Sequence, residues 1–134
     1  MADPIATFFT SVGCMDGRVQ KAVNRYASLI FGAEFADTVT EAGLVGVFSK
    51  KETDPEMYED VKGMILVSTD KHKSSGIIVH GHENCAGNPV NEEQQKEDIK
   101  KTVDTVQEIL EDRKIEVHGV YVHLTPRVRI EQIV

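Results

Sequence analysis

The chain has 134 residues, the ordinary length of one globular domain, and 40% of them are hydrophobic, so we expect a single domain over 1–134 with its own core. The formal net charge of −7, from 15 basic and 22 acidic residues, disfavours nucleic-acid binding, and the sequence has no basic stripe interleaved with aromatic residues. No apolar run approaches the roughly 20 residues that cross a bilayer, and the first residues lack the basic start of a signal peptide, so we expect a cytoplasmic protein not bound to a membrane.

The first half of the chain alternates strand and helix patterns. The apolar, β-branched run 5–12 predicts a buried strand, and the apolar residues of 18–31 recur at helical spacing until Gly32, which suits the positive φ of a helix end. Residues 35–40 predict a second strand, and the segment 54–71 opens with an Asp-Pro pair that is typical of a helix start. The predicted inward stripes are Val19, Val23, Ala27 and Ile30 in the first helix and Met57, Val61, Met64 and Ile65 in the second.

The second half continues this alternation. Residues 76–80 form a continuous apolar run, as expected for a strand covered on both faces, and Asn91 precedes the longest predicted helix, over 92–110. Residues 117–124 predict a fourth strand, and the alternating segment 127–130 predicts an edge strand that pairs back. The sequence therefore predicts an α/β fold, with a mostly parallel sheet of four strands in the order 2-1-3-4, a C-terminal edge strand, and helices on both faces.

Two short motifs follow the first and third predicted strands and carry the chain's only two cysteines. The first motif is Cys14-Met-Asp-Gly-Arg18, and the second is His82-Glu-Asn-Cys85. Because the carboxyl ends of neighbouring parallel strands meet at one edge of a sheet, Cys14, His82 and Cys85 can reach one ion. Thiolate and imidazole are ligands that zinc prefers, and three protein ligands leave a fourth position for water, as in catalytic sites. The sequence therefore predicts a Zn²⁺ cofactor on these three side chains.

Asp16 and Arg18 lie just beyond the first of these ligands. The Asp16 carboxylate either takes the fourth zinc position or accepts a hydrogen bond from zinc-bound water, and a bidentate pair with Arg18 would favour the second arrangement. Zinc lowers the pKa of bound water from about 15.7 to about 7 in favourable sites, which makes hydroxide available as a nucleophile. We therefore predict Asp16 and Arg18 as catalytic residues, with Asp16 as the alternative fourth ligand.

These motifs resemble those of the β-class carbonic anhydrases, in which Cys-x-Asp-Ser-Arg follows the first strand and Gly-His-x-x-Cys-Gly follows the third. The similarity in element order extends over nearly the whole chain. The resemblance implies zinc on Cys14, His82 and Cys85, an Asp16–Arg18 dyad, and reversible hydration of carbon dioxide to bicarbonate by a zinc-bound hydroxide. It also implies a homodimer or higher homo-oligomer, because the active sites of this family usually lie at a subunit interface.

Three departures from the family pattern concern the substrate site. Gly17 stands where the family has serine. Thr40 and Glu41 stand where the family commonly has Arg-Asn, so a basic residue is lost and a negative charge is added close to the expected bicarbonate position. Only 13 residues precede Cys14, so the helical N-terminal arm of the family and its substrate-binding glutamine have no counterpart in this sequence. We interpret the chain as a short, diverged member.

Two other functions stay open on the same residues. The chain would be a catalytically inactive zinc-binding module if Asp16 closed the fourth position of the metal. It would be a hydrolase of a related small electrophile, such as carbonyl sulfide or carbon disulfide, if the same zinc machinery acted on that substrate.

The remaining side chains near the predicted metal fall into two groups. The segment after the second strand is predicted to line a substrate pocket, through Glu41, Gly43, Val45, Val47 and Phe48. The apolar members of this group, Val45, Val47 and Phe48, would suit a nonpolar gas. His80 alternates with the apolar residues of its strand, and we favour a hydrogen-bonded histidine of the core over a hydrogen-bond donor to a metal ligand.

Overall fold

The structure is a computed structural model and describes residues 6–134. Strands and helices alternate along the chain, with one additional short helical segment after the second strand. In chain order the elements are β1 (Phe8–Cys14), α1 (Gly17–Phe31), β2 (Phe35–Glu41), α2 (Leu44–Phe48), the 3₁₀ turn η1 (Lys51–Thr53), α3 (Pro55–Asp70), β3 (Ile77–His82), α4 (Glu92–Leu110), β4 (Val117–His123) and β5 (Arg129–Gln132).

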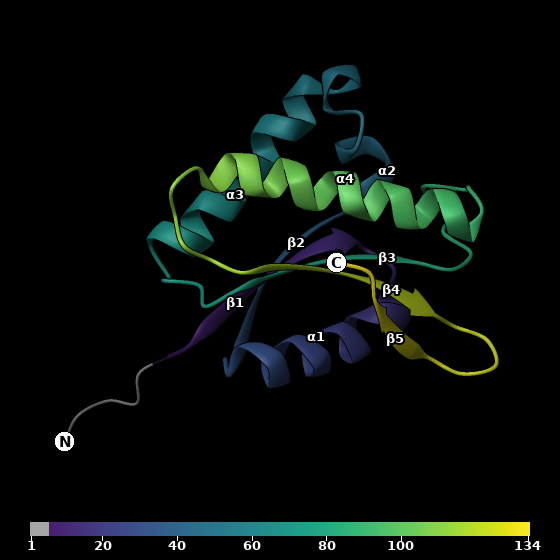
Figure 1. Cartoon of the computed structure of the whole chain (residues 1–134), viewed down its shortest axis with the longest axis horizontal. Helices are drawn as coiled ribbons and strands as arrows, with labels where there is room; N and C mark the ends of the chain where they lie inside the picture. Colours follow the sequence, from purple (N-terminus) through teal and green to yellow (C-terminus); the bar gives the residue numbers. More distant parts are fainter. Residues whose placement is uncertain (1–5) are drawn as a thin grey trace.

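The strands form one sheet in the order β2-β1-β3-β4-β5. The first four strands are parallel, and β5 runs antiparallel to β4. Helix α1 covers one face of this sheet, and α2, α3 and α4 lie on the other face (Figure 1). The predicted α/β class, strand order and placement of helices on both faces are confirmed. The carboxyl ends of β1 and β3, two neighbouring strands, meet at one edge of the sheet.

The helix ends follow from local side-chain chemistry. The side chains of Asp16, Asp54 and Asn91 each accept a hydrogen bond from a backbone N–H in the first turn of α1, α3 and α4, respectively. Gly32 closes α1 with a φ of 62°, a left-handed conformation that costs glycine little. The predicted caps at Asp54 and Asn91 and the predicted helix end at Gly32 are therefore confirmed.

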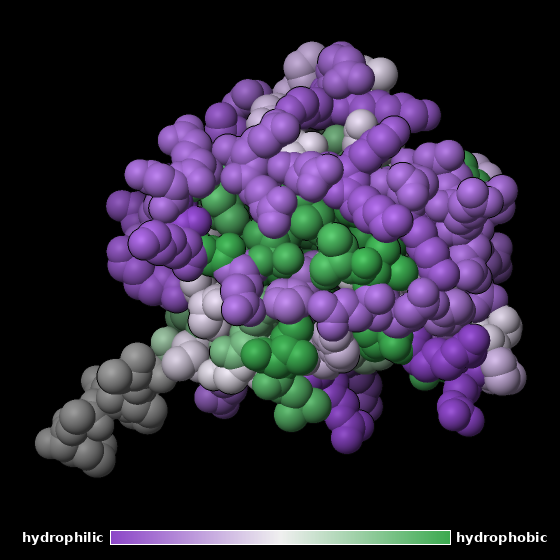
Figure 2. Space-filling view, in the orientation of Figure 1, coloured by the Kyte–Doolittle hydropathy of each residue, from purple (hydrophilic) through white to green (hydrophobic). Residues whose placement is uncertain are grey.

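The hydrophobic core has two parts, one on each face of the sheet. The part under α1 contains Val19, Val23 and Ala27, and the larger part lies under α2, α3 and α4. Figure 2 shows apolar side chains gathered across the middle of one face and framed by hydrophilic residues. The predicted stripes are wrong at Ile30 and Met64, which are 42% and 43% exposed because they lie at the margin of their helices' buried faces.

Three element predictions need correction. The first strand extends to Cys14 rather than ending before Gly13, and its predicted start at Ile5 lies outside the described residues. Strand β5 begins at Arg129, two residues later than predicted, because residues 125–128 form the turn after β4. Helix α2 and η1 were not predicted, since five residues with one glycine and two valines have a weak intrinsic tendency to form a helix.

In residues 6–134, no helix has the combination of length and apolar composition needed to span a membrane.

Candidate metal centre

Cys14, His82 and Cys85 converge at the carboxyl edge of the sheet. Cys14 is the last residue of β1, His82 is the last residue of β3, and Cys85 lies in the loop that follows. Their ligand atoms all lie within 4.8 Å of one another, and the two sulfur atoms are 3.7 Å apart. All three side chains are buried, and both cysteines are free thiols. Cys14 lies 68 positions from His82 and 71 from Cys85 in the sequence, and the three form one compact donor set because β1 and β3 are neighbours.

The His82 ring has the orientation that a metal ligand requires. Its Nδ1 atom lies 2.8 Å from the carbonyl oxygen of Glu83, so Nδ1 carries the proton and Nε2 keeps its lone pair. Among the described residues, Nε2 is buried and has no hydrogen-bond partner. A buried acceptor without a partner is costly, and a metal ion beside the two sulfurs would satisfy it. The two thiols and this imidazole nitrogen fit zinc in both chemical type and number.

The electrostatic environment of the two thiols also favours a cation. Burial raises the pKa of Cys85, and the negative charge of the neighbouring Cys14 raises it further. Backbone N–H groups of Asn88 and Gly87 act in the opposite direction, and the Gly43 N–H donates to Cys14 Sγ at 3.3 Å. Two thiolates this close repel each other, so a divalent cation between them would remove the main obstacle to their ionisation.

Asp16 and Arg18 form a bidentate ion pair beside this donor set. Arg18 Nε donates to Asp16 Oδ1 at 3.0 Å, and Arg18 Nη2 donates to Oδ2 at 2.7 Å. These hydrogen bonds lower the pKa of Asp16 to about 2, despite the opposing effect of partial burial. Asp16 Oδ2 lies 3.8 Å from His82 Nε2, and Arg18 Nη2 also donates to the Asn84 carbonyl at 3.3 Å. The dyad therefore lies next to the donor set and connects the two motif-bearing loops.

The residues predicted to line a substrate pocket are distributed over different environments. Glu41 ends β2 opposite Cys14 and is exposed, and Gly43 contacts Cys14 through its backbone. Val45 and Phe48 are buried in the core on the α4 side of the sheet, whereas Val47 is partly exposed. Because Val45 and Phe48 are closed off from solvent, the structure provides no open pocket wall at these two side chains. A role beside a substrate stays a prediction for this group.

His80 differs from its interpretation as a hydrogen-bonded core residue. The ring is fully buried, but neither ring nitrogen has a hydrogen-bond partner within residues 6–134. Burial, with a smaller effect of His82, lowers the pKa of His80 to about 3 and keeps the ring neutral. The ring packs against Gly13, where a Cβ atom would lie only 2.4 Å from it. His80 is thus a core residue that fills space beneath the donor set.

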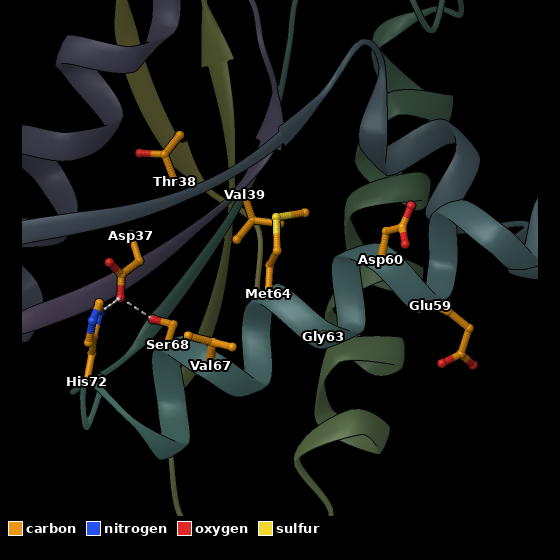
Figure 3. A pocket seen from close by; sticks show the side chains of 10 residues that line it. All are labelled: Asp37, Thr38, Val39, Glu59, Asp60, Gly63, Met64, Val67, Ser68 and His72. Atoms are coloured by element: carbon orange, nitrogen blue, oxygen red, sulfur yellow. Dashed lines mark hydrogen bonds and ion pairs between the residues drawn. The ribbon is translucent and has the colours of Figure 1, made fainter.

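A separate hollow of about 550 Å³ lies between β2 and α3 (Figure 3). Its most polar part is a hydrogen-bonded group in which Asp37 Oδ2 accepts from Ser68 Oγ at 2.7 Å and lies 2.8 Å from His72 Nδ1. A hydrolase needs its histidine between the hydroxyl and the carboxylate. Here the carboxylate lies in the middle, so the arrangement does not activate Ser68 as a nucleophile.

Sequence reasoning missed the polar residues that support the Cys85 loop. Asn88, Gln95 and Asp98 are buried, and Asn88 is hydrogen-bonded to both Gln95 and Asp98 between α2 and α4. The sequence did contain a signal, because Gln95 and Asp98 fall on the same helical face as the apolar residue Ile99. A polar residue at a buried helical position indicates a specific partner elsewhere in the fold.

Comparisons with known proteins agree with this geometry. A family model described as "Putative carbonic anhydrase" matches residues 5–134. No curated protein matches the chain. One similar solved structure comes from a study of two tetrameric β-carbonic anhydrases of Sordaria macrospora, with 14% identity, a TM-score of 0.62, and coverage of 97% of this chain and 81% of that one. Another is the β-carbonic anhydrase CafA of Aspergillus fumigatus, with 14% identity, a TM-score of 0.54, and coverage of 96% and 75%.

At such low identity the two structures establish a shared fold, and the family model, which spans nearly the whole chain, establishes descent. The two motifs that carry the resemblance lie at the carboxyl ends of β1 and β3. The chain therefore belongs to the β-carbonic anhydrase family.

Proposed function

We propose that this protein is a zinc enzyme that reversibly hydrates carbon dioxide to bicarbonate. The observation that carries the proposal is the convergence of Cys14, His82 and Cys85, whose ligand atoms lie within 4.8 Å of one another beside the Asp16–Arg18 pair. Membership of the β-carbonic anhydrase family supports the same reaction.

Each side chain has a defined part in this proposal. Cys14, His82 and Cys85 would hold the ion, which when bound lowers the pKa of a water and makes hydroxide available as a nucleophile. Asp16 is ionised at neutral pH because its pKa is about 2, so its carboxylate accepts the hydrogen bond of the nucleophile and orients it. Arg18 binds both Asp16 oxygens and so fixes the direction of that acceptor.

The test is stopped-flow carbon dioxide hydration by the zinc-loaded protein. We expect activity in the wild type and none in Cys85→Ala, because that variant lacks one of the three donors. A matched control is His72→Gln, which changes a histidine of the separate hollow and should retain wild-type activity. An inert wild-type protein with one zinc per chain would reject the proposed reaction.

A catalytically inactive zinc module is the second candidate. Asp16 Oδ2 lies only 3.8 Å from His82 Nε2, so the carboxylate is close enough to the donor set to serve as a fourth ligand. Glu41, opposite Cys14 on the neighbouring strand, adds negative charge that disfavours an anionic product. A metal-edge spectrum with four protein ligands and no water at alkaline pH would support this candidate over the enzyme.

We also propose that the protein assembles into a homodimer or higher homo-oligomer in the cytoplasm. The similar proteins of Sordaria macrospora are described as tetrameric. Phe35, Met64 and Val67, on β2 and α3, are each between 43% and 53% exposed, and such apolar side chains are often covered in an oligomer. Light scattering of the purified protein tests the assembly, with a strictly monomeric mass as the contradicting result.

A further inference from the structure

The buried carboxylate of Asp98 is the starting point of a polar connection to the candidate metal centre. Asp98 lies on α4 and is only 2% exposed. It accepts hydrogen bonds from Asn88 Nδ2 at 3.0 Å, Gln94 Nε2 at 2.9 Å and Ser49 Oγ at 3.3 Å. Within residues 6–134 it takes part in no ion pair. A buried carboxylate bonded only to neutral donors is costly, which indicates that it serves a specific arrangement.

Asn88 is the residue that this arrangement holds most firmly. Its side chain donates to Asp98, and its carbonyl oxygen accepts from Gln95 Nε2 at 3.2 Å. On the opposite side, the amide of Asn88 lies against Gly46 of α2, where an added Cβ would be 2.4 Å from it. Asn88 is thus enclosed between α2 and α4, with its side chain and its backbone both bonded to α4.

The backbone around Asn88 then reaches both sulfur-bearing loops. Asn88 donates its N–H to the Cys85 carbonyl at 3.3 Å, which closes the turn that begins with this cysteine. The adjacent Gly87 lies directly on Gly43, so closely that a Cβ on Gly43 would be 2.3 Å from the Gly87 carbonyl group. Gly43 in turn donates its N–H to Cys14 Sγ at 3.3 Å. A continuous set of contacts therefore runs from Asp98 to both cysteines.

We propose that Asn88 and Asp98 are positioning residues that pre-place the two sulfurs for the metal. Their hydrogen bond holds the 85–88 turn against Gly43, so the donor set is assembled before an ion arrives. Without this hydrogen bond, metal binding must itself order the turn, and the entropy lost in doing so weakens the zinc affinity. The inference rests on the proposed zinc site and extends it beyond the ligands.

The experiment measures zinc affinity by competition with a chromophoric chelator, alongside urea unfolding of the metal-free protein. We expect Asn88→Ala and Asp98→Ala each to weaken zinc binding by about 10- to 100-fold, the range seen when groups that orient metal ligands are removed. The double variant should bind zinc about as tightly as the single variant with the lower affinity, because both changes break the same connection. Asp98→Asn keeps an acceptor for Asn88 and should recover part of the affinity.

Thr102→Val is the matched control. Thr102 is also a buried polar residue of α4, and its hydroxyl donates to the Val45 carbonyl of α2 at 3.3 Å without reaching the 85–88 turn. It should lower stability and leave zinc affinity unchanged. Gly46→Ala provides a second test of the Asn88 position if the Asp98 variants do not fold. Its methyl group displaces the Asn88 amide from the α2 side, so it should also weaken zinc binding.

The outcomes separate this inference from the proposed function. A wild type that binds zinc, with Asn88 and Asp98 variants of equal affinity, would overturn the positioning role and leave the proposed zinc site in place. Equal loss of affinity in Thr102→Val would also overturn it, because general loosening between α2 and α4 would then explain the effect. A wild type that binds no zinc would overturn the proposed function, and this inference with it.

Discussion

The loop after β1 and the loop after β3 each contribute a cysteine to the candidate metal centre, but different parts of the molecule hold them. The first loop is held by the Asp16–Arg18 pair, in which the Arg18 side chain is 52% exposed. The second loop is held by Asn88 and Asp98, which are buried between α2 and α4. Exposed ion pairs contribute little to stability, whereas a buried hydrogen bond is expensive to break. The first loop is therefore held by contacts open to solvent, and the second by contacts inside the fold.

The largest effect should come from removing a donor in the rigid second loop. Cys85→Ser should reduce zinc from one equivalent per chain to none after dialysis, because serine is a poor zinc ligand at neutral pH. Metal analysis by mass spectrometry measures this. Retention of a full equivalent by the variant would show that Cys85 is not a ligand.

In the exposed first loop, the substitution Asp16→Asn should affect turnover more than metal binding. Asparagine caps a helix as well as aspartate does, so Asp16→Asn should preserve α1. It removes the charge that orients the nucleophile, and we expect the hydration rate to fall about 100-fold, the order of loss caused by misplacing a reacting group. Stopped-flow rates with zinc content measured in parallel test this, and a loss of zinc without a loss of turnover per bound zinc would contradict it.

Two glycines sharpen the comparison through stability. Gly17 lies in the first loop's motif, and Gly43, in the turn after β2, packs against Gly87 of the second loop. Gly43→Ala should destabilise the protein by more than about 2 kcal/mol, because φ is 62° and the new methyl group would strike the Gly87 backbone. Gly17→Ala should be neutral or stabilising by about 0.5 kcal/mol, since Gly17 begins α1 with nothing within 4 Å of an added Cβ. Urea unfolding of both variants measures the difference, and equal losses would remove the distinction between the loops.

The smallest effect should come from the exposed ion pair itself. Arg18→Ala should lower the free energy of unfolding only slightly at pH 7, because the ion pair is exposed to solvent. Because the folded-state pKa of Asp16, about 2, lies below its ordinary value of 3.8, the pair stabilises the protein above pH 4, and this contribution disappears as the pH falls through 2. The difference in unfolding free energy between wild type and variant should therefore shrink over that interval. A difference that is constant from pH 7 to pH 2 would exclude the Asp16 carboxylate as its source.

The fold was predictable where short-range patterns decide it. The caps at Asp54 and Asn91 depend on side chains adjacent to the helix they start, and the alternation of strands and helices leads to a parallel sheet by general rules. Helix α2 was not predictable in the same way, because its five residues become helical through packing on α4. The exposure of Ile30 likewise depends on its place at the margin of the face that α1 buries against the sheet.

For the candidate site, the sequence by itself determined the donor types, their two motifs, and their place after the first and third strands. The adjacency of Asp16 and Arg18 made their pairing predictable, since residues this near in the chain meet whatever the rest of the fold does. Only the tertiary structure decided that Asn88 meets Asp98, that Gly43 contacts both Cys14 and the Gly87 backbone, and that His80 is buried without a partner among residues 6–134. The physical reason is that these contacts join separate elements, and burial and hydrogen bonding between them depend on how the layers pack, which no local pattern encodes.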